Sequence, residues 1–62
     1  MSNDVVDRIR IAAFMKHGGN IRIVRLHTAD GNPRLYVCQI KHDRIISILA
    51  SGIKKQQILN QL

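Results

Sequence analysis

The sequence is poor in the residues that usually fill or crosslink a small core. It has 62 residues with no tryptophan, and its only aromatic side chains are Phe14 and Tyr36. Its single cysteine, Cys38, excludes an intrachain disulfide and favours a reducing, cytoplasmic environment. A domain of this size buries only about 60% of the surface of its unfolded chain. We therefore expect one small domain, residues 1–62, with an aliphatic core.

Acidic residues are scarce, and long apolar runs are missing. Ten Lys and Arg stand against four Asp and no Glu, which gives a net charge of +6. Residues 1–10, MSNDVVDRIR, lack the basic and then apolar pattern of a signal peptide. No apolar run approaches the roughly 20 residues of a membrane-spanning helix. These absences predict a cytoplasmic protein with no membrane partner. The charge favours a polyanion, although many small soluble proteins are basic without one.

Residues 21–41, IRIVRLHTADGNPRLYVCQIK, have the pattern of two strands joined by a tight turn. Asp30-Gly31 suits a two-residue type I′ turn, because both of its central positions need positive φ. This turn produces cross-strand pairs of like residues: Ile21 with Ile40, Ile23 with Cys38, Val24 with Val37, and Leu26 with Leu35. Such pairs favour this register over one that is shifted by a single residue.

Both faces of this predicted hairpin are partly apolar. A hairpin with one face in water would alternate apolar and polar residues cleanly. We therefore expect each face to be covered, either by the flanking helices or by a second copy of the chain. Pairing between two copies would also protect the open strand edges, so the sequence predicts a homodimer.

The segment before the hairpin has helical spacing and helix-ending signals. Asn3 or Asp4 can cap a helix, and Val5, Ile9 and Ala13 fall on one side of it. Gly18-Gly19 is typical of a helix end. Residues 8–11 also alternate as a strand would, but this stretch is too short to outweigh the helical signals.

The segment after the hairpin is predicted to be helical as well. Asp43 is the expected cap of a helix over HDRIISILAS, and Gly52 interrupts it. Residues 53–62, IKKQQILNQL, form either a third helix or the second half of a bent one. The predicted fold class is thus α+β, an α-β-β-α-α domain built around a two-stranded antiparallel hairpin.

Residues 45–62, IISILASGIKKQQILNQL, resemble the first two helices of the helix-turn-helix in response-regulator and transposase DNA-binding domains. The resemblance consists of apolar pairs at Ile45-Ile46 and Leu49-Ala50, the turn residue Gly52, and Ile58 six residues later. It implies contact with DNA. The other interpretation is an ordinary helical corner packed on the hairpin.

The hairpin is a second candidate for contact with nucleic acid. Two-stranded ribbons fit the major groove, and Arg22, Arg25, Arg34 and Lys41 lie along this one. Tyr36, predicted opposite Arg25, either stacks on a base or holds the guanidinium by a cation–π contact. Arginines on exposed strands also keep strand edges soluble without binding anything.

Catalytic and metal-binding patterns are missing. The residues suited to such chemistry are His17, His27, His42 and Cys38, and no two of them have the spacing of zinc ligands. The Asp residues are assigned to caps and turns, which leaves no carboxylate pair for acid–base catalysis. Gly18-Gly19 is not part of a phosphate-binding loop. The sequence therefore predicts neither an enzyme nor a cofactor.

The favoured function is a small basic DNA-binding regulatory protein of bacterial or phage type that acts as a dimer. Its expected mechanism is neutralisation of phosphates by basic side chains. The predicted nucleic-acid-binding residues are Arg8, Arg10, Arg22, Arg25, Arg34, Lys41, Lys54 and Lys55. The alternative is a non-enzymatic interaction module that binds and modulates a larger partner protein, including one with an acidic surface.

Overall fold

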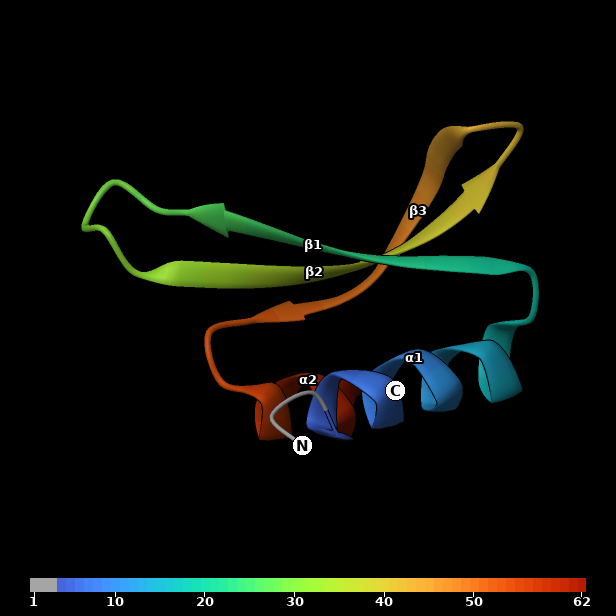
Figure 1. Cartoon of the computed structure of the whole chain (residues 1–62), viewed down its shortest axis with the longest axis horizontal. Coiled ribbons are helices and arrows are strands. Elements are labelled where there is room, and N and C mark those ends of the chain that lie inside the picture. Colours follow the sequence, from blue (N-terminus) through green and yellow to red (C-terminus); the bar gives the residue numbers. More distant parts are fainter. Residues whose placement is uncertain (1–3) are drawn as a thin grey trace.

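The chain forms a three-stranded antiparallel sheet with two helices on one of its faces (Figure 1). The structure is a computed structural model, and it describes residues 4–62. The elements are α1 (Asp4–His17), β1 (Asn20–His27), β2 (Pro33–Lys41), β3 (Arg44–Gly52) and α2 (Lys55–Gln61), and the strands lie in the order β1-β2-β3. The predicted α+β class is confirmed, but the order is α-β-β-β-α rather than α-β-β-α-α.

Helix α1 confirms the predicted first helix. It ends at His17, and Gly18 and Gly19 follow with φ of 70° and 76°. Glycine adopts such angles without the steric cost that a Cβ brings. The Gly18 N–H donates to the Phe14 carbonyl oxygen at 2.8 Å and so closes the last turn. The predicted cap at Asn3 lies outside the residues that the structure describes.

The β1–β2 hairpin is present, but its predicted register is wrong by one residue. The Thr28 N–H donates to the Asn32 carbonyl oxygen at 2.9 Å, so the loop has three central residues, 29–31, rather than two. Of these, Gly31 has positive φ, at 86°. The Gly31 N–H also donates to the Thr28 carbonyl oxygen at 2.9 Å, which closes a β-turn over residues 28–31. A β-turn that ends in a left-handed glycine is a common three-residue hairpin loop. Asp30 stabilises it by accepting hydrogen bonds from the backbone N–H and side-chain amide of Asn32.

This longer loop changes which side chains share a face of the sheet. Ile21 pairs with Gln39 and Ile23 with Val37, instead of with Ile40 and Cys38. A shift of one residue turns the side chains of one strand to the opposite face relative to its partner. Ile21 and Ile23 therefore lie on the face that carries Leu35 and Val37.

Strand β3 replaces the helix that was predicted after Asp43. His42 and Asp43 both have positive φ, 53° and 61°, and form a tight turn between β2 and β3. The apolar residues of this nine-residue segment stand at positions 45, 46, 48 and 49, a spacing that is compatible with a helix and with a short buried strand. Three of the four are β-branched isoleucines, which favour a strand. Antiparallel pairing with β2 makes this segment a strand rather than a helix. The helix-turn-helix interpretation is wrong, because its first helix is this strand.

Two irregularities in the pairing of β2 and β3 bend the sheet. The register shifts between Val37 and Cys38 and again between Gln39 and Ile40. Each shift leaves one residue of β3 without a direct partner, first Leu49 and then Ile46. Such bulges increase the local twist of a strand. In Figure 1 the β2–β3 turn accordingly stands well away from the helices.

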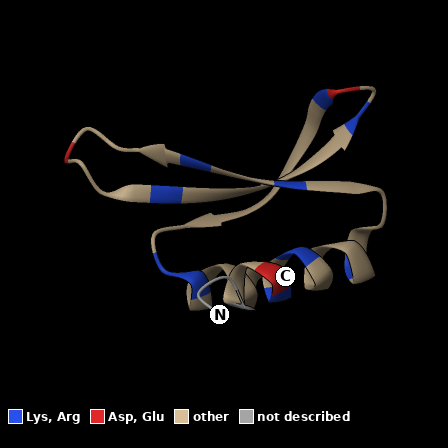
Figure 2. Cartoon of the chain, in the orientation of Figure 1, with Lys and Arg blue, Asp and Glu red and all other residues tan. Residues whose placement is uncertain are grey.

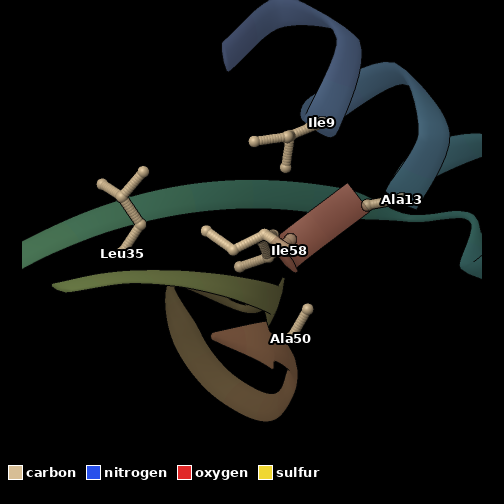
Figure 3. Close-up of a cluster of buried hydrophobic side chains, with 6 residues drawn as sticks. Ile9, Ala13, Leu35, Ala50 and Ile58 are labelled. Atoms are coloured by element: carbon tan, nitrogen blue, oxygen red, sulfur yellow. The ribbon is translucent and has the colours of Figure 1, made fainter. Parts of the chain in front are cut away.

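Both helices and all three strands contribute to one aliphatic core, as Figure 3 shows for part of it. Its buried residues are Ile9 and Ala13 from α1, Leu35 and Val37 from β2, Ala50 from β3, and Ile58 from α2. The Gln39 amide also fastens β2 to the end of α1, since its Nε2 donates to the carbonyl oxygens of His17 at 3.3 Å and Gly18 at 3.1 Å. The expected aliphatic core is therefore confirmed, but it lies on one face of the sheet only.

Candidate functional site

The face of the sheet that points away from the helices is apolar, and the described residues leave it uncovered. We call it the open face and define it by the residues that line a shallow hollow of about 340 Å³: Val24, Leu26, Tyr36, Cys38, Ile45 and Ile48. They come from all three strands. In Figure 1 this face lies above the sheet, opposite α1 and α2. The expectation that both faces are covered is therefore not met within one chain.

The pairing of the strands explains why these side chains meet. Val24 pairs with Tyr36, Cys38 with Ile48, and Ile40 with Ile45. Alternate residues of a strand share a face, so even-numbered positions of β1 and β2 point to the same side. The bulge at Leu49 keeps Ile48 on this side, and the bulge at Ile46 does the same for Ile45. The open face is thus a product of the loop length and the two bulges.

Three of these side chains are more than half exposed to solvent. Leu26, Ile45 and Ile48 are 55%, 53% and 53% exposed. Single exposed apolar residues are normal on protein surfaces, but a contiguous patch commonly marks a binding surface. A second exposed apolar set lies on the outer side of α1 and consists of Ile11, Phe14 and Met15. The open face differs from this set in drawing its residues from three strands.

Cys38 lies near the centre of the open face but is itself buried. Desolvation raises the pKa of its thiol, and the nearby charge of Arg22 opposes this increase. A thiol kept in its protonated form is a poor nucleophile and a poor metal ligand. Cys38 therefore acts as a small apolar side chain in the sheet.

The three strands carry basic residues but no acidic ones. Their five Lys and Arg are Arg22, Arg25, Arg34, Lys41 and Arg44. By register, Arg22 and Arg34 belong to the same side of the sheet as the open face. Arg25 pairs with the core residue Leu35, and the Lys41–Arg44 rung follows the Ile40–Ile45 rung, so these three basic residues belong to the side of the helices. The open face is therefore an apolar surface with two arginines, Arg22 and Arg34, and no acidic residue on its side of the strands.

The eight basic residues predicted to bind nucleic acid do not gather on one surface. Figure 2 shows Lys and Arg on all five elements. Arg8 and Arg10 lie on α1, Arg22 and Arg25 on β1, Arg34 and Lys41 on β2, and Lys54 and Lys55 at the start of α2. Arg10 and Arg25 share a hollow with Asp7 between α1 and the sheet. The predicted pairing of Tyr36 with Arg25 is wrong, because Arg25 pairs with Leu35.

The described residues hold no cluster of potential metal ligands. Within residues 4–62, no group of three or more His, Cys, Asp or Glu side chains is placed to hold a metal ion. Over the same range, each buried side-chain nitrogen or oxygen has a hydrogen-bond partner. No helix between Asp4 and Leu62 has the length and apolar character needed to cross a membrane.

The sequence interpretation missed the open face because it assigned residues 42–51 to a helix. In a helix, Ile45 and Ile48 contribute to a buried stripe, whereas in β3 they join Val24 and Tyr36 on the sheet. The β-branched run IISI was the available signal for a strand.

In comparisons with known proteins, the chain matches no protein-family model, no curated protein and no solved structure.

Proposed function

We propose that this chain is a non-enzymatic interaction module that binds a larger partner protein through the open face. The observation that carries the proposal is the uncovered apolar surface formed by β1, β2 and β3, with three aliphatic side chains more than half exposed. Covering such a surface removes apolar area from water and favours association by roughly 25 cal/mol per Å².

The size of the open face sets what the partner must cover. The largest apolar patch on a typical monomer is about 300–600 Å², and a stable interface buries about 800 Å² on each partner. A partner therefore contacts the open face together with the residues around it, which include Arg22 and Arg34. The apolar centre supplies most of the affinity, while the charges at the rim speed association and select the partner.

Affinity capture with matched variants tests this proposal. The variant Leu26→Ser/Ile48→Ser removes apolar area from the open face at exposed positions, so the fold tolerates it. The control Met15→Ser/Ile53→Ser changes two other exposed apolar residues outside that face. We expect the wild-type chain and the control to retain the same specific protein, and the open-face variant to lose it. Equal capture by all three chains contradicts the proposal.

DNA binding remains a second candidate, and the net charge of +6 favours it. A basic regulator of bacterial or phage type neutralises phosphates with the eight predicted Lys and Arg residues. Titration of mixed-sequence DNA at two salt concentrations tests this function. We expect steep salt dependence that falls by about one unit of slope for each phosphate-contacting residue removed, for example in Lys54→Ala. Absence of binding at low salt excludes it.

A homodimer also remains a prediction. Sedimentation of the wild-type chain against the two double variants decides it and identifies the surface that pairs. Dissociation by Leu26→Ser/Ile48→Ser assigns pairing to the open face. Dissociation by Met15→Ser/Ile53→Ser assigns pairing to one of the other exposed apolar positions.

A further inference from the structure

The open face has the length and width of a single helix. The rung of Ile40 and Ile45 and the rung of Leu26 and Arg34 are six residues apart along β2. At about 3.3 Å per residue this distance is roughly 20 Å, and three strands at about 4.8 Å spacing make the face roughly 10 Å wide. A helix of about 13 residues is 20 Å long and about 10 Å in diameter.

The other face of the same sheet shows how a helix covers these strands. Helix α1 has 14 residues, and it packs Ile9 and Ala13 into the core with Leu35 and Val37 of β2. An apolar face of a sheet is stably covered by a helix or by another sheet. A helix of similar length on the open face would give the sheet a helix on each side.

The charges on the open face favour a helix of another protein over a second copy of this chain as the occupant. The strands carry no acidic residue, and two of their basic residues, Arg22 and Arg34, lie on the side of the open face. Of the four Asp residues, Asp4 and Asp7 lie on α1, Asp30 lies in the β1–β2 loop and Asp43 in the β2–β3 turn. Two copies packed through this face would place Arg22 and Arg34 of both chains in one interface without carboxylates, and like charges across an interface disfavour association. A partner with carboxylates reverses the sign of that interaction.

We propose that the open face binds an acidic amphipathic helix of another protein, about 13 residues long. Its apolar side chains lie against Val24, Tyr36, Ile45 and Ile48. Its Asp and Glu side chains lie beside Arg22 and Arg34, which share this side of the sheet by register. Recognition of an amphipathic helix by an apolar groove is a recurring mode of peptide binding. This inference rests on the proposed function and specifies the chemistry of the partner.

Fluorescence anisotropy with labelled synthetic peptides tests the inference. The probe is a set of three 14-residue helical peptides. Each carries leucines on one side of the helix and glutamates on the other, and the three peptides differ in the position at which the leucine pattern begins. Control peptides have lysine in place of each glutamate. We expect at least one acidic peptide to bind at least tenfold more tightly than its lysine control, with an affinity that falls as salt is added.

Variants of the chain locate the binding site. Ile48→Ser should weaken binding of the acidic peptide at least tenfold, whereas Ile53→Ser, at a position of similar exposure outside the open face, should leave it unchanged. The charge reversal Arg22→Glu/Arg34→Glu should shift the preference towards the lysine peptide. Circular dichroism of each variant checks that the fold is retained.

Three results overturn the inference: equal binding of acidic and lysine peptides, no binding of any acidic peptide, or binding that Ile48→Ser does not change. A dimer that dissociates in Ile48→Ser also overturns it, because the occupant is then a second copy. If affinity capture still depends on the open face while the acidic peptides fail to bind, the interaction function stands and only the acidic helix is wrong.

Discussion

Gln61 forms two hydrogen bonds with the backbone of Ser51. The Ser51 N–H donates to Oε1 of Gln61 at 3.1 Å, and Nε2 of Gln61 donates to the Ser51 carbonyl oxygen at 2.8 Å. The side-chain amide thus occupies the place of a neighbouring strand at the edge of β3. An unpaired strand edge invites pairing with another chain, so this contact joins α2 to the sheet and covers part of the edge.

Replacement of Gln61 should destabilise the fold. Gln61→Ala leaves two backbone groups of Ser51 without their partners, and we expect it to lower the free energy of unfolding by about 1–2 kcal/mol. Urea denaturation followed by circular dichroism measures this change. Gln56→Ala is the matched control, because the Gln56 amide contacts only the exposed Asn60 side chain in the structure. Equal losses in both variants contradict the role of Gln61.

The core should be sensitive at Ile58. Its side chain is fully buried between α2 and the sheet, and Gly52 lies close to it, so that a Cβ on Gly52 would stand 3.4 Å from an Ile58 carbon. Ile58→Ala should cost about 2–5 kcal/mol, which is a large part of the stability of a domain this small. Ile53→Ala, at a half-exposed position, should change stability by less than about 0.5 kcal/mol. Thermal unfolding of the two variants makes the comparison.

Asp43 distinguishes the observed strand from the predicted helix. In the β2–β3 turn, Asp43 has a φ of 61°, which glycine adopts without strain. Asp43→Gly should therefore stabilise the chain by about 1 kcal/mol. If Asp43 capped a helix instead, the same change would destabilise the chain by a few tenths of a kcal/mol. The sign of the change in unfolding free energy decides between the two structures.

Asp30 should make stability depend on pH in the acid range. The hydroxyl of Thr28 and the backbone N–H of Asn32 donate to its carboxylate, and these hydrogen bonds lower the pKa of Asp30 below its ordinary value. The unfolded chain therefore takes up this proton at a higher pH than the folded chain does. The contribution of Asp30 is present above its ordinary pKa of about 3.9 and is lost as the pH falls through its lower folded value.

Melting temperatures between about pH 5 and pH 2 measure this effect, and Asp30→Asn is the comparison. The wild-type chain should lose stability more steeply than the variant as acid is added. Parallel curves for the two chains would show that the loop hydrogen bonds of Asp30 do not contribute to stability.

Local signals in the sequence determined the parts of the fold that depend on few residues. The helical spacing of Val5, Ile9 and Ala13 and the stop at Gly18-Gly19 predicted α1. The polar and apolar spacing of residues 53–62 predicted α2, and the β-branched runs on either side of Asp30-Gly31 predicted β1 and β2. Helix ends and turns are set by the backbone preferences of neighbouring residues, which are legible in a single sequence.

Tertiary structure alone decided the β1–β2 register, the identity of residues 44–52 and the open face. The loop hydrogen bonds of Thr28, Asp30 and Asn32 add one residue to the turn, and the choice between two and three loop residues depends on which faces the helices bury. A short apolar run such as IISILA fits a helix or a strand equally well until β2 offers it backbone partners. The open face follows from both outcomes, because it exists only when three strands place their outward side chains side by side.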